Sequence, residues 1–318
     1  MQSTLSNKRT FPYVNALIGL YLLIFTVTFM FLGETAIDCA NQGVVVFRDT
    51  VMPAILPFAF AITFFNATMG KDLTSLFSPI AKRLKFSPDG FYIYFIGLLG
   101  GTPLGTSASI SAYKNGAISS QETLKLICLT SVASPLLTIT CVGKLTYGSF
   151  IVGTTLFASQ IISAIICHPL LCDKKVTTLP ISKNSTKLFD DYIISIVKSL
   201  ATNCVLTIFF YTAVSLTVKT NDGFILFENT LLKGLLTGIF ETNYGLDALS
   251  LIRCPTSYGI ANAVLTFGGL PVVIQTVVLT NQLKIRTTHI VFFKLAQSLI
   301  CFLLTFILTN FLLLLRLF

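Results

Sequence analysis

The sequence predicts an all-α polytopic membrane protein built from two pseudo-repeats, each with a broken or re-entrant helical hairpin. Hydrophobic residues make up 53% of the chain and charged residues 11%. Eight uncharged runs are at least 18 residues long, close to the roughly 20 residues that a helix needs to cross a bilayer. Two of them contain Gly-Gly-x-Pro at the centre, from Gly100 to Pro103 and from Gly268 to Pro271. The uncharged runs are 13–33, 51–70, 90–113, 126–143, 145–172, 199–218, 255–283 and 295–315.

The first run, Tyr13 to Gly33, has some features of a signal peptide. Its apolar part is too long for one, and no small-residue cleavage site follows, so we expect it to remain as a transmembrane helix. Residues 34–47 contain Glu34 and Asp38 but no Lys or Arg, which predicts an external loop. The predicted divisions are 1–42 (N-terminal helix and external loop), 43–172 (first repeat), 173–187 (cytoplasmic linker) and 188–318 (second repeat).

The net charge is +9, and basic residues cluster in four places: at Lys8 and Arg9, in 71–85, in 173–187, and at Lys284, Arg286 and Lys294. Clusters of this kind mark the cytoplasmic side of a membrane protein. We therefore expect a cytoplasmic N-terminus and contact with a lipid bilayer, and we do not expect a nucleic-acid partner.

Three apolar runs lie between the connections 71–85 and 173–187, so one of them should not cross the membrane. We expect residues 90–113 to form a re-entrant hairpin, because paired glycines and a proline interrupt the run and weaken a helix. Lipid cannot satisfy the freed backbone groups, so such a break needs protein or a polar cavity around it. The same argument predicts a hairpin in 255–283. Interrupted segments in matching halves indicate a transporter's binding site.

The relative orientation of the two halves depends on residues 224–247, which carry Glu228, Lys233, Glu241 and Asp247. If this segment lies at the membrane interface, the two hairpins enter from opposite faces. If it crosses, they enter from the same face, and the sequence leaves both arrangements open.

Candidate binding residues in the first half surround the break. A helix N-terminus at such a break presents free N–H groups and the positive end of a dipole, which suits a carboxylate or another polar acceptor. The alternative is that these small residues serve only close helix packing. The candidates are Gly100, Gly101, Thr102, Pro103, Gly105, Thr106 and Ser107, with Ser131 and Ser134 beside Pro135 in the following run.

Candidate binding residues in the second half include one carboxylate. A buried Glu241 would be costly in a membrane and would therefore be a candidate ligand for a solute or a coupling ion; a hydrated, interfacial glutamate is the alternative. For Gln275, the alternative is an interhelical hydrogen bond. For Ser131, in the first half, the alternative is a simple proline kink. The candidates are Glu241, Thr242, Asn243, Gly268, Gly269 and Gln275.

Several kinds of site are not expected. The chain has two histidines and no Cys-x-x-Cys pair, so we predict no metal site. It has no Gly-x-x-x-x-Gly-Lys-Ser/Thr motif, which excludes ATP-driven transport by this chain alone. No other cofactor is predicted. No catalytic residue is predicted either, because Ser107 lacks the following glycine of a membrane serine protease and His168 abuts a proline. Homo-oligomer formation stays open.

Five segments carry a resemblance to a known family. The chain resembles the YlbJ-like sporulation integral membrane proteins, whose nucleoside recognition (Gate) domain also occurs in nucleoside permeases and in the FeoB iron transporter. Ser134 differs from the asparagine usual in that family before the proline. The similar segments are Met52 to Phe58, Gly101 to Gly105, Lys114 to Gly116 with Ser119 and Glu122, Gly238 to Thr242, and Phe267 to Leu270.

The resemblance implies a transporter or permease-like protein that moves a small polar or anionic solute, dipicolinate-like or nucleoside-like, and that is linked to sporulation. It also implies a bacterial cell membrane, or a membrane surrounding the forespore. Movement would be facilitated or coupled to an ion. The alternative is a non-transporting scaffold or assembly factor in spore formation.

Overall fold

The computed structural model describes residues 23, 25–61, 78–82, 86–102, 104–170, 188–220, 228–280 and 287–316. Within these ranges the chain is mostly helical and contains no strand. Five of the helices are long and apolar enough to cross a membrane. The predicted class, an all-α polytopic membrane protein, is confirmed. The five helices are Gly33–Ala61, Phe150–Cys167, Val197–Thr220, Pro255–Thr280 and Thr288–Leu314.

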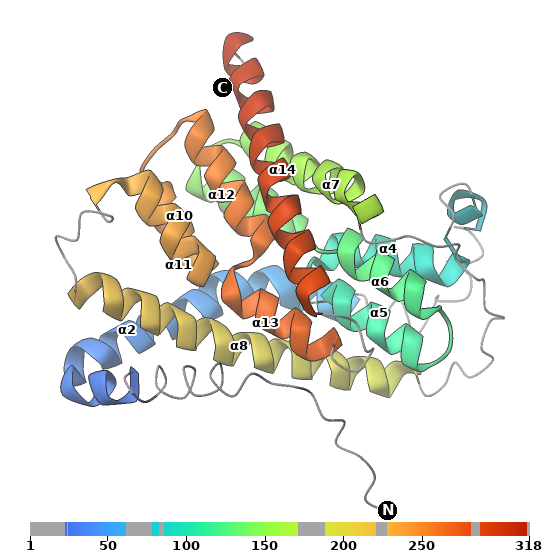
Figure 1. Cartoon of the computed structure of the whole chain (residues 1–318), viewed down its shortest axis with the longest axis horizontal. Helices are drawn as coiled ribbons and strands as arrows, with labels where there is room; N and C mark the ends of the chain where they lie inside the picture. Colours follow the sequence, from blue (N-terminus) through green and yellow to red (C-terminus); the bar gives the residue numbers. More distant parts are fainter. Residues whose placement is uncertain are drawn as a thin grey trace, which may run out of the picture.

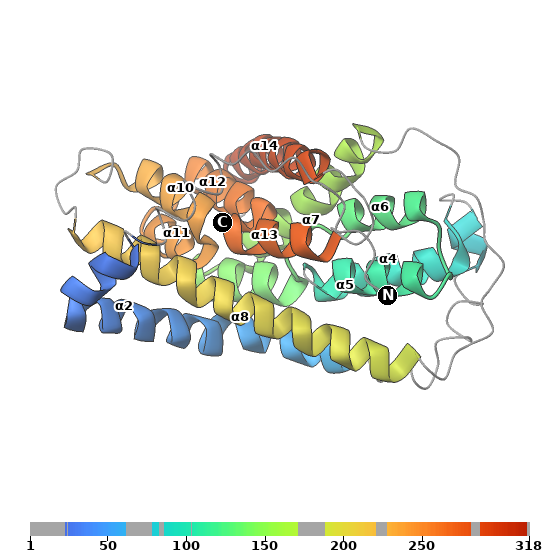
Figure 2. The same ribbon diagram turned by 60° about the horizontal axis from the view of Figure 1, so that its bottom comes forward.

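Figure 1 shows α2 and α8 side by side along one side of the molecule, with α14 rising toward the C-terminus. In Figure 2, α8 runs along the length of the molecule, with α5 near one end and the α10–α11 pair near the other. The elements are α2 (Gly33–Val46), η1 (Phe47–Val51), α4 (Pro88–Gly100), α5 (Leu104–Lys114), α6 (Ser120–Leu129), η2 (Leu136–Thr146), α7 (Phe150–Cys167), η3 (His168–Leu170), α8 (Leu188–Thr220), α10 (Thr230–Phe240), α11 (Thr242–Leu249), α12 (Pro255–Phe267), α13 (Gly269–Thr280) and α14 (Thr287–Leu314).

The same order of elements occurs twice. A helical hairpin (α4–α5), a broken helix (α6–η2) and a long helix (α7) follow the Gly33–Ala61 helix, and the hairpin α10–α11, the broken helix α12–α13 and α14 follow α8. By this order, the break at Gly101 corresponds to the break at Glu241, and the break at 131–135 corresponds to Gly268. The two Gly-Gly-x-Pro motifs, which begin at Gly100 and Gly268, therefore do not occupy equivalent places. The first lies at a hairpin tip and the second at the bend of a broken helix.

The α4–α5 hairpin forms where the sequence predicts it. Gly97 and Gly105 allow its two helices to meet closely, because a Cβ on Gly105 would lie 3.1 Å from the Gly97 Cα. α10 and α11 form a similar hairpin that turns at Glu241. There, a Cβ on Gly245 would overlap the Gly238 Cα. Small residues thus bring the two legs of each hairpin into backbone contact.

The hairpin predicted in 255–283 is wrong. α12 and α13 form one candidate span, Pro255–Thr280, with a bend at Gly268 and Gly269. Both glycines have positive φ, of 79° and 63°, so the chain changes direction without turning back. α12 packs against α14, whereas α13 packs against α8 and α5 (Figure 1). These different partners hold the two halves of the helix apart.

The external loop predicted for residues 34–47 is also wrong. These residues are helical and belong to the Gly33–Ala61 helix, so the predicted boundary at residue 42 falls inside α2. Glu34 and Asp38 lie on its exposed face, while Gly43 on the opposite face packs against the α8 backbone. The predicted cytoplasmic linker, 173–187, lies outside the described residues.

Glu122 joins the beginnings of two helices in the first half. Its side chain is fully buried, and its Oε1 accepts hydrogen bonds from Ser87 N at 2.7 Å and from Ser87 Oγ at 2.8 Å. Ser87 caps α4 by accepting from Gly90 N. In turn, Ser119 caps α6 by accepting from the Glu122 N–H. The motif Ser119 to Glu122 thus anchors the hairpin to the broken helix.

We expect Glu122→Ala to destabilise the protein by about 2 to 4 kcal/mol, because two buried donors of Ser87 would lose their acceptor. Thermal unfolding of the purified protein in detergent measures the effect. Asp38→Ala, which removes an exposed carboxylate, should leave the melting temperature unchanged. A Glu122→Ala protein that melts with the wild type would contradict this role.

Candidate functional site

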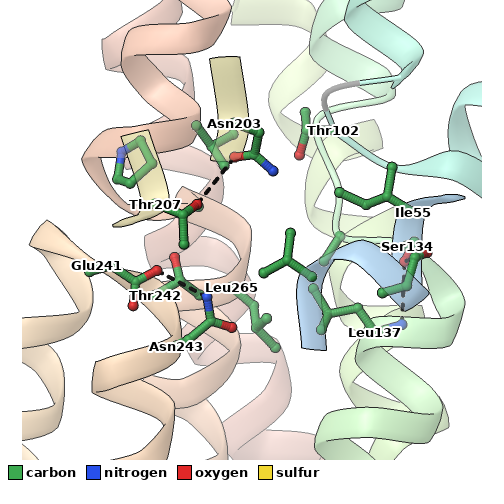
Figure 3. Close-up of a pocket in the computed structure, with 16 residues that line it drawn as sticks. Ile55, Thr102, Ser134, Leu137, Asn203, Thr207, Glu241, Thr242, Asn243 and Leu265 are labelled. Carbon is green, nitrogen blue, oxygen red and sulfur yellow. Dashed lines mark hydrogen bonds between the residues drawn. The ribbon is translucent and has the colours of Figure 1, made fainter. Parts of the chain in front are cut away.

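All four breaks meet around one cavity of about 70 Å³. Figure 3 shows the residues around Glu241 facing Ile55, Ser134 and Leu137 across it. The lining combines apolar side chains with hydroxyl, amide and carboxylate groups. The lining residues are Val51, Ala54, Ile55, Thr102, Ala133, Ser134, Leu137, Asn203, Thr207, Glu241, Thr242, Asn243, Leu265, Gly268, Pro271 and Val272.

In the first half, the hairpin tip lies directly on the break of α6–η2. Thr102 N donates a hydrogen bond to Val132 O at 2.9 Å. Gly101 has a φ of 65°, and a Cβ on it would lie 2.5 Å from Ser134 N and 2.9 Å from Val132 O. Only glycine fits both the backbone conformation and this contact.

Ser134 begins the second part of this broken helix. Its Oγ accepts a hydrogen bond from Leu137 N at 3.3 Å and donates one to Ala54 O at 3.5 Å. It therefore caps η2 and also holds the Gly33–Ala61 helix against the break. Its side chain is 97% buried and lines the cavity.

In the second half, the hairpin tip also contacts the break, but the glycine and the side chains are on opposite partners. Here the glycine is on the broken helix: a Cβ on Gly269 would lie 3.0 Å from Thr242 Oγ1 and 3.2 Å from Thr242 N. The hairpin tip contributes the side chains. Each half thus brings one hairpin tip and one helix break into close contact at the cavity.

Among the described residues that line the cavity, Glu241 is the only ionisable one. Its side chain is buried, and its carboxylate accepts hydrogen bonds from Tyr244 N at 2.8 Å and from Asn243 Nδ2 at 3.0 Å. It therefore caps α11, and the positive end of that helix offsets part of its charge. Glu241 is therefore buried within the protein rather than exposed on its surface.

Thr242 adds a polar group without a partner. Its Oγ1 is buried and makes no hydrogen bond within the described residues, although the residue lines the cavity. A buried hydroxyl without a partner loses free energy that a bound solute or water could restore.

Sequence reasoning missed Asn203 and Thr207 on α8. Both are at least 96% buried, both line the cavity, and Thr207 Oγ1 donates to Asn203 Oδ1 at 3.5 Å (Figure 3). Their spacing of four residues within the uncharged run 199–218, which places them on one helix face, is the signal that could have found them.

Eight of the predicted candidates do not line the cavity in the described structure. Gly105 packs against Thr130, and Gln275 Nε2 donates to Ser199 O at 2.6 Å, as in the alternative of an interhelical hydrogen bond. Thr106 and Ser107 are buried with unpartnered hydroxyls. Pro103 lies outside the described residues. The candidates away from the cavity lining are Gly100, Gly101, Gly105, Thr106, Ser107, Ser131, Gly269 and Gln275.

A buried hydrogen-bond network behind the cavity joins the two halves. Gln160 on α7 accepts from Ala133 N at 2.9 Å and donates to Asn262 Oδ1 on α12 at 2.8 Å. Asn262 Nδ2 donates to Leu156 O at 2.9 Å and to Thr305 Oγ1 at 2.7 Å. These side chains are fully satisfied, so they fix α7, α12 and α14 as a frame around the breaks.

The described ranges contain neither a metal-binding cluster nor a paired serine and histidine. No group of three or more His, Cys, Asp or Glu side chains there is placed to hold a metal ion. Ser107 Oγ and His168 Nε2 are each buried without a hydrogen-bond partner, so they do not form the pair that a serine hydrolase uses.

Comparison with protein-family models, curated proteins and solved structures finds no match to this chain. The resemblance to the YlbJ-like proteins therefore stays a prediction.

Proposed function

We propose that this protein is a membrane transporter that binds a small polar solute in the cavity between its two hairpin tips and two helix breaks. The observation that carries the proposal is the lining of the cavity, to which both hairpin tips and both breaks contribute. Interrupted helices that meet at one buried polar site are the usual construction of a transporter's binding site.

The packing suggests which parts move. α7, α12 and α14 are joined by the Gln160 and Asn262 network, whereas the α4–α5 tip is joined to its break by the backbone bond from Thr102 to Val132. A hairpin tip that separates from its break would open the cavity without disturbing the frame. Two such hairpins, one in each half, could then act as alternating gates.

The lining favours a solute that donates hydrogen bonds and has an apolar face. Glu241, Asn203 and Asn243 offer acceptor oxygens, and no Lys or Arg from the described part of the chain lines the cavity. Ile55, Leu265 and their neighbours supply apolar contacts. A nucleoside-like compound has both features, whereas the two carboxylates of a dipicolinate-like anion would meet the Glu241 side chain.

The size of the cavity adds a condition. At about 70 Å³ it is well below the roughly 300 Å³ at the lower end of pockets for drug-sized ligands. A nucleoside-like solute therefore requires a hairpin to move outward. The proposal includes the sporulation role and the bacterial membrane that the family resemblance implies, and movement is facilitated or ion-coupled because the chain has no ATP-binding motif.

Uptake into proteoliposomes tests the proposal. The panel contains nucleosides, dipicolinate with related dicarboxylates, and small amines, and protein-free liposomes give the background. We expect saturable uptake of one class, with nucleosides favoured. Background uptake of every class by protein that remains monodisperse would contradict transport and favour the scaffold alternative.

A further inference from the structure

Lys294 is a buried cation that the proposed solute site does not use. It lies on α14 within the candidate span Thr288–Leu314, and only 1% of its surface is exposed. Its Nζ donates a hydrogen bond to Thr266 O at 3.0 Å. No carboxylate within the described residues forms an ion pair with it. A buried ammonium in a membrane is costly unless another group compensates its charge.

The compensating group is the carboxyl end of α12. Thr266 is the second-last residue of this helix, and the chain leaves it through Gly268 in the left-handed conformation. The Gly268 N–H bonds back to Val264 O at 2.8 Å. The carbonyls of the last turn carry about half a negative charge in total. A bilayer core contains no water that could hydrogen-bond to them. The Lys294 ammonium satisfies one of these carbonyls.

The position of Lys294 relative to the cavity is specific. Leu265 and Gly268 line the cavity from the same end of α12, whereas Lys294 contacts that end from α14 and is not part of the lining. The ammonium therefore acts from behind the break. It stabilises the interrupted end of the helix at the point where the cavity wall is formed.

We propose that the Lys294 ammonium acts as a covalently attached cation that stabilises the end of α12. If the ammonium were removed, a free monovalent cation could take its place. The break at Gly268 then needs no bound metal ion to keep its shape. This part of the proposal is independent of transport. Where it extends to transport, it rests on the proposed function and implies that no coupling Na⁺ binds at this break.

Gln297 is a buried polar group on α14 that could help to hold a replacement ion. It lies one turn beyond Lys294 on the same face of α14, it is fully buried, and neither its Oε1 nor its Nε2 has a hydrogen-bond partner within the described residues. Truncation of Lys294 would leave a space beside Thr266 O. A small cation in that space would have the Thr266 carbonyl oxygen as a ligand.

The test is thermal unfolding of the purified protein in chloride salts of choline, lithium, sodium, potassium and methylammonium at equal ionic strength. The wild type should melt at the same temperature in all of them. Lys294→Ala should melt about 5 °C or more lower in choline and should recover in at least one of the smaller cations. Lys294→Met fills the space without a charge, so it should stay destabilised in every salt.

Two comparisons keep the test decisive. Lys294→Arg retains the charge and should be more stable than Lys294→Met. Lys125→Ala removes another buried cation, whose Nζ lies 3.8 Å from the centroid of the Phe86 ring, and should show no selective recovery. A melting temperature of Lys294→Met that equals or exceeds that of Lys294→Arg would overturn the inference. So would a melting temperature of Lys294→Ala that no cation raises. Since unfolding needs no transported solute, either failure would leave the proposed function standing.

Discussion

Gly101→Ala is expected to reduce solute uptake by about a hundredfold, because the added Cβ would separate the first hairpin tip from the break of α6–η2. It would lie 2.5 Å from Ser134 N and 2.9 Å from Val132 O. Both are backbone atoms, so they cannot rotate away as a flexible side chain would. A displacement of about 1 Å at a positioning contact can cost this much activity, and uptake into proteoliposomes measures it.

Gly116→Ala is the matched control for this change. Gly116 also has a positive φ, of 73°, against 65° at Gly101, but its added Cβ would meet nothing within 4 Å. Gly116→Ala therefore tests the effect of a positive φ alone. Gly101→Ala adds the displacement of the tip and the strain of a ψ of −168°, a backbone region that essentially only glycine adopts. Equal uptake by the two variants would show that the tip contact has no part in transport.

Glu241→Gln is expected to weaken solute binding by about twofold to thirtyfold. The glutamine side chain can still accept the hydrogen bond from Tyr244 N, so the cap of α11 is retained while the charge in the cavity is lost. Hydrogen bonds to a charged group contribute about 1.5 to 3 kcal/mol, against about 1 kcal/mol for neutral pairs. Thermal stabilisation by the nucleosides of the panel gives the change in affinity.

Glu228→Gln controls for the loss of a carboxylate. Glu228 is exposed and does not line the cavity, so its variant should bind and melt as the wild type does. If Glu241→Gln binds with unchanged affinity while Glu241→Ala is less stable, the carboxylate serves only as the cap of α11. The proposed contact with the solute would then be wrong.

The hairpins were partly predictable because their signals are local. Paired glycines in an apolar run mark a break, and both Gly100 and Gly268 lie at one. The same local pattern cannot distinguish a hairpin from a bent helix. That difference depends on partners distant in the sequence, since α12 packs on α14 while α13 packs on α8.

Parts of the cavity were predictable for a different reason. Thr102, Ser134 and Glu241 sit at breaks that glycine, proline or charge makes visible in the sequence, and all three line the cavity. Asn203 and Thr207 sit in an unbroken run, and only the packing of α8 decides which face they occupy. The acidic residues of α2 misled the loop prediction because a helix can carry them on an exposed face.

The most direct test of a central cavity with two gates is the reactivity of a cysteine placed in it. Ser134→Cys is nearly isosteric, and Cys141, Cys172, Cys204 and Cys254 would be replaced by alanine in the background. A membrane-impermeant thiol reagent is then added to either side of proteoliposomes, with and without each nucleoside of the uptake panel. A Thr106→Cys variant in the same background gives the rate at a buried position outside the lining.

The account predicts that Ser134→Cys is modified from both sides of the membrane, faster than Thr106→Cys, and that a transported nucleoside slows both reactions. Modification from one side alone, or rates that no solute changes, would contradict a solute cavity with alternating gates.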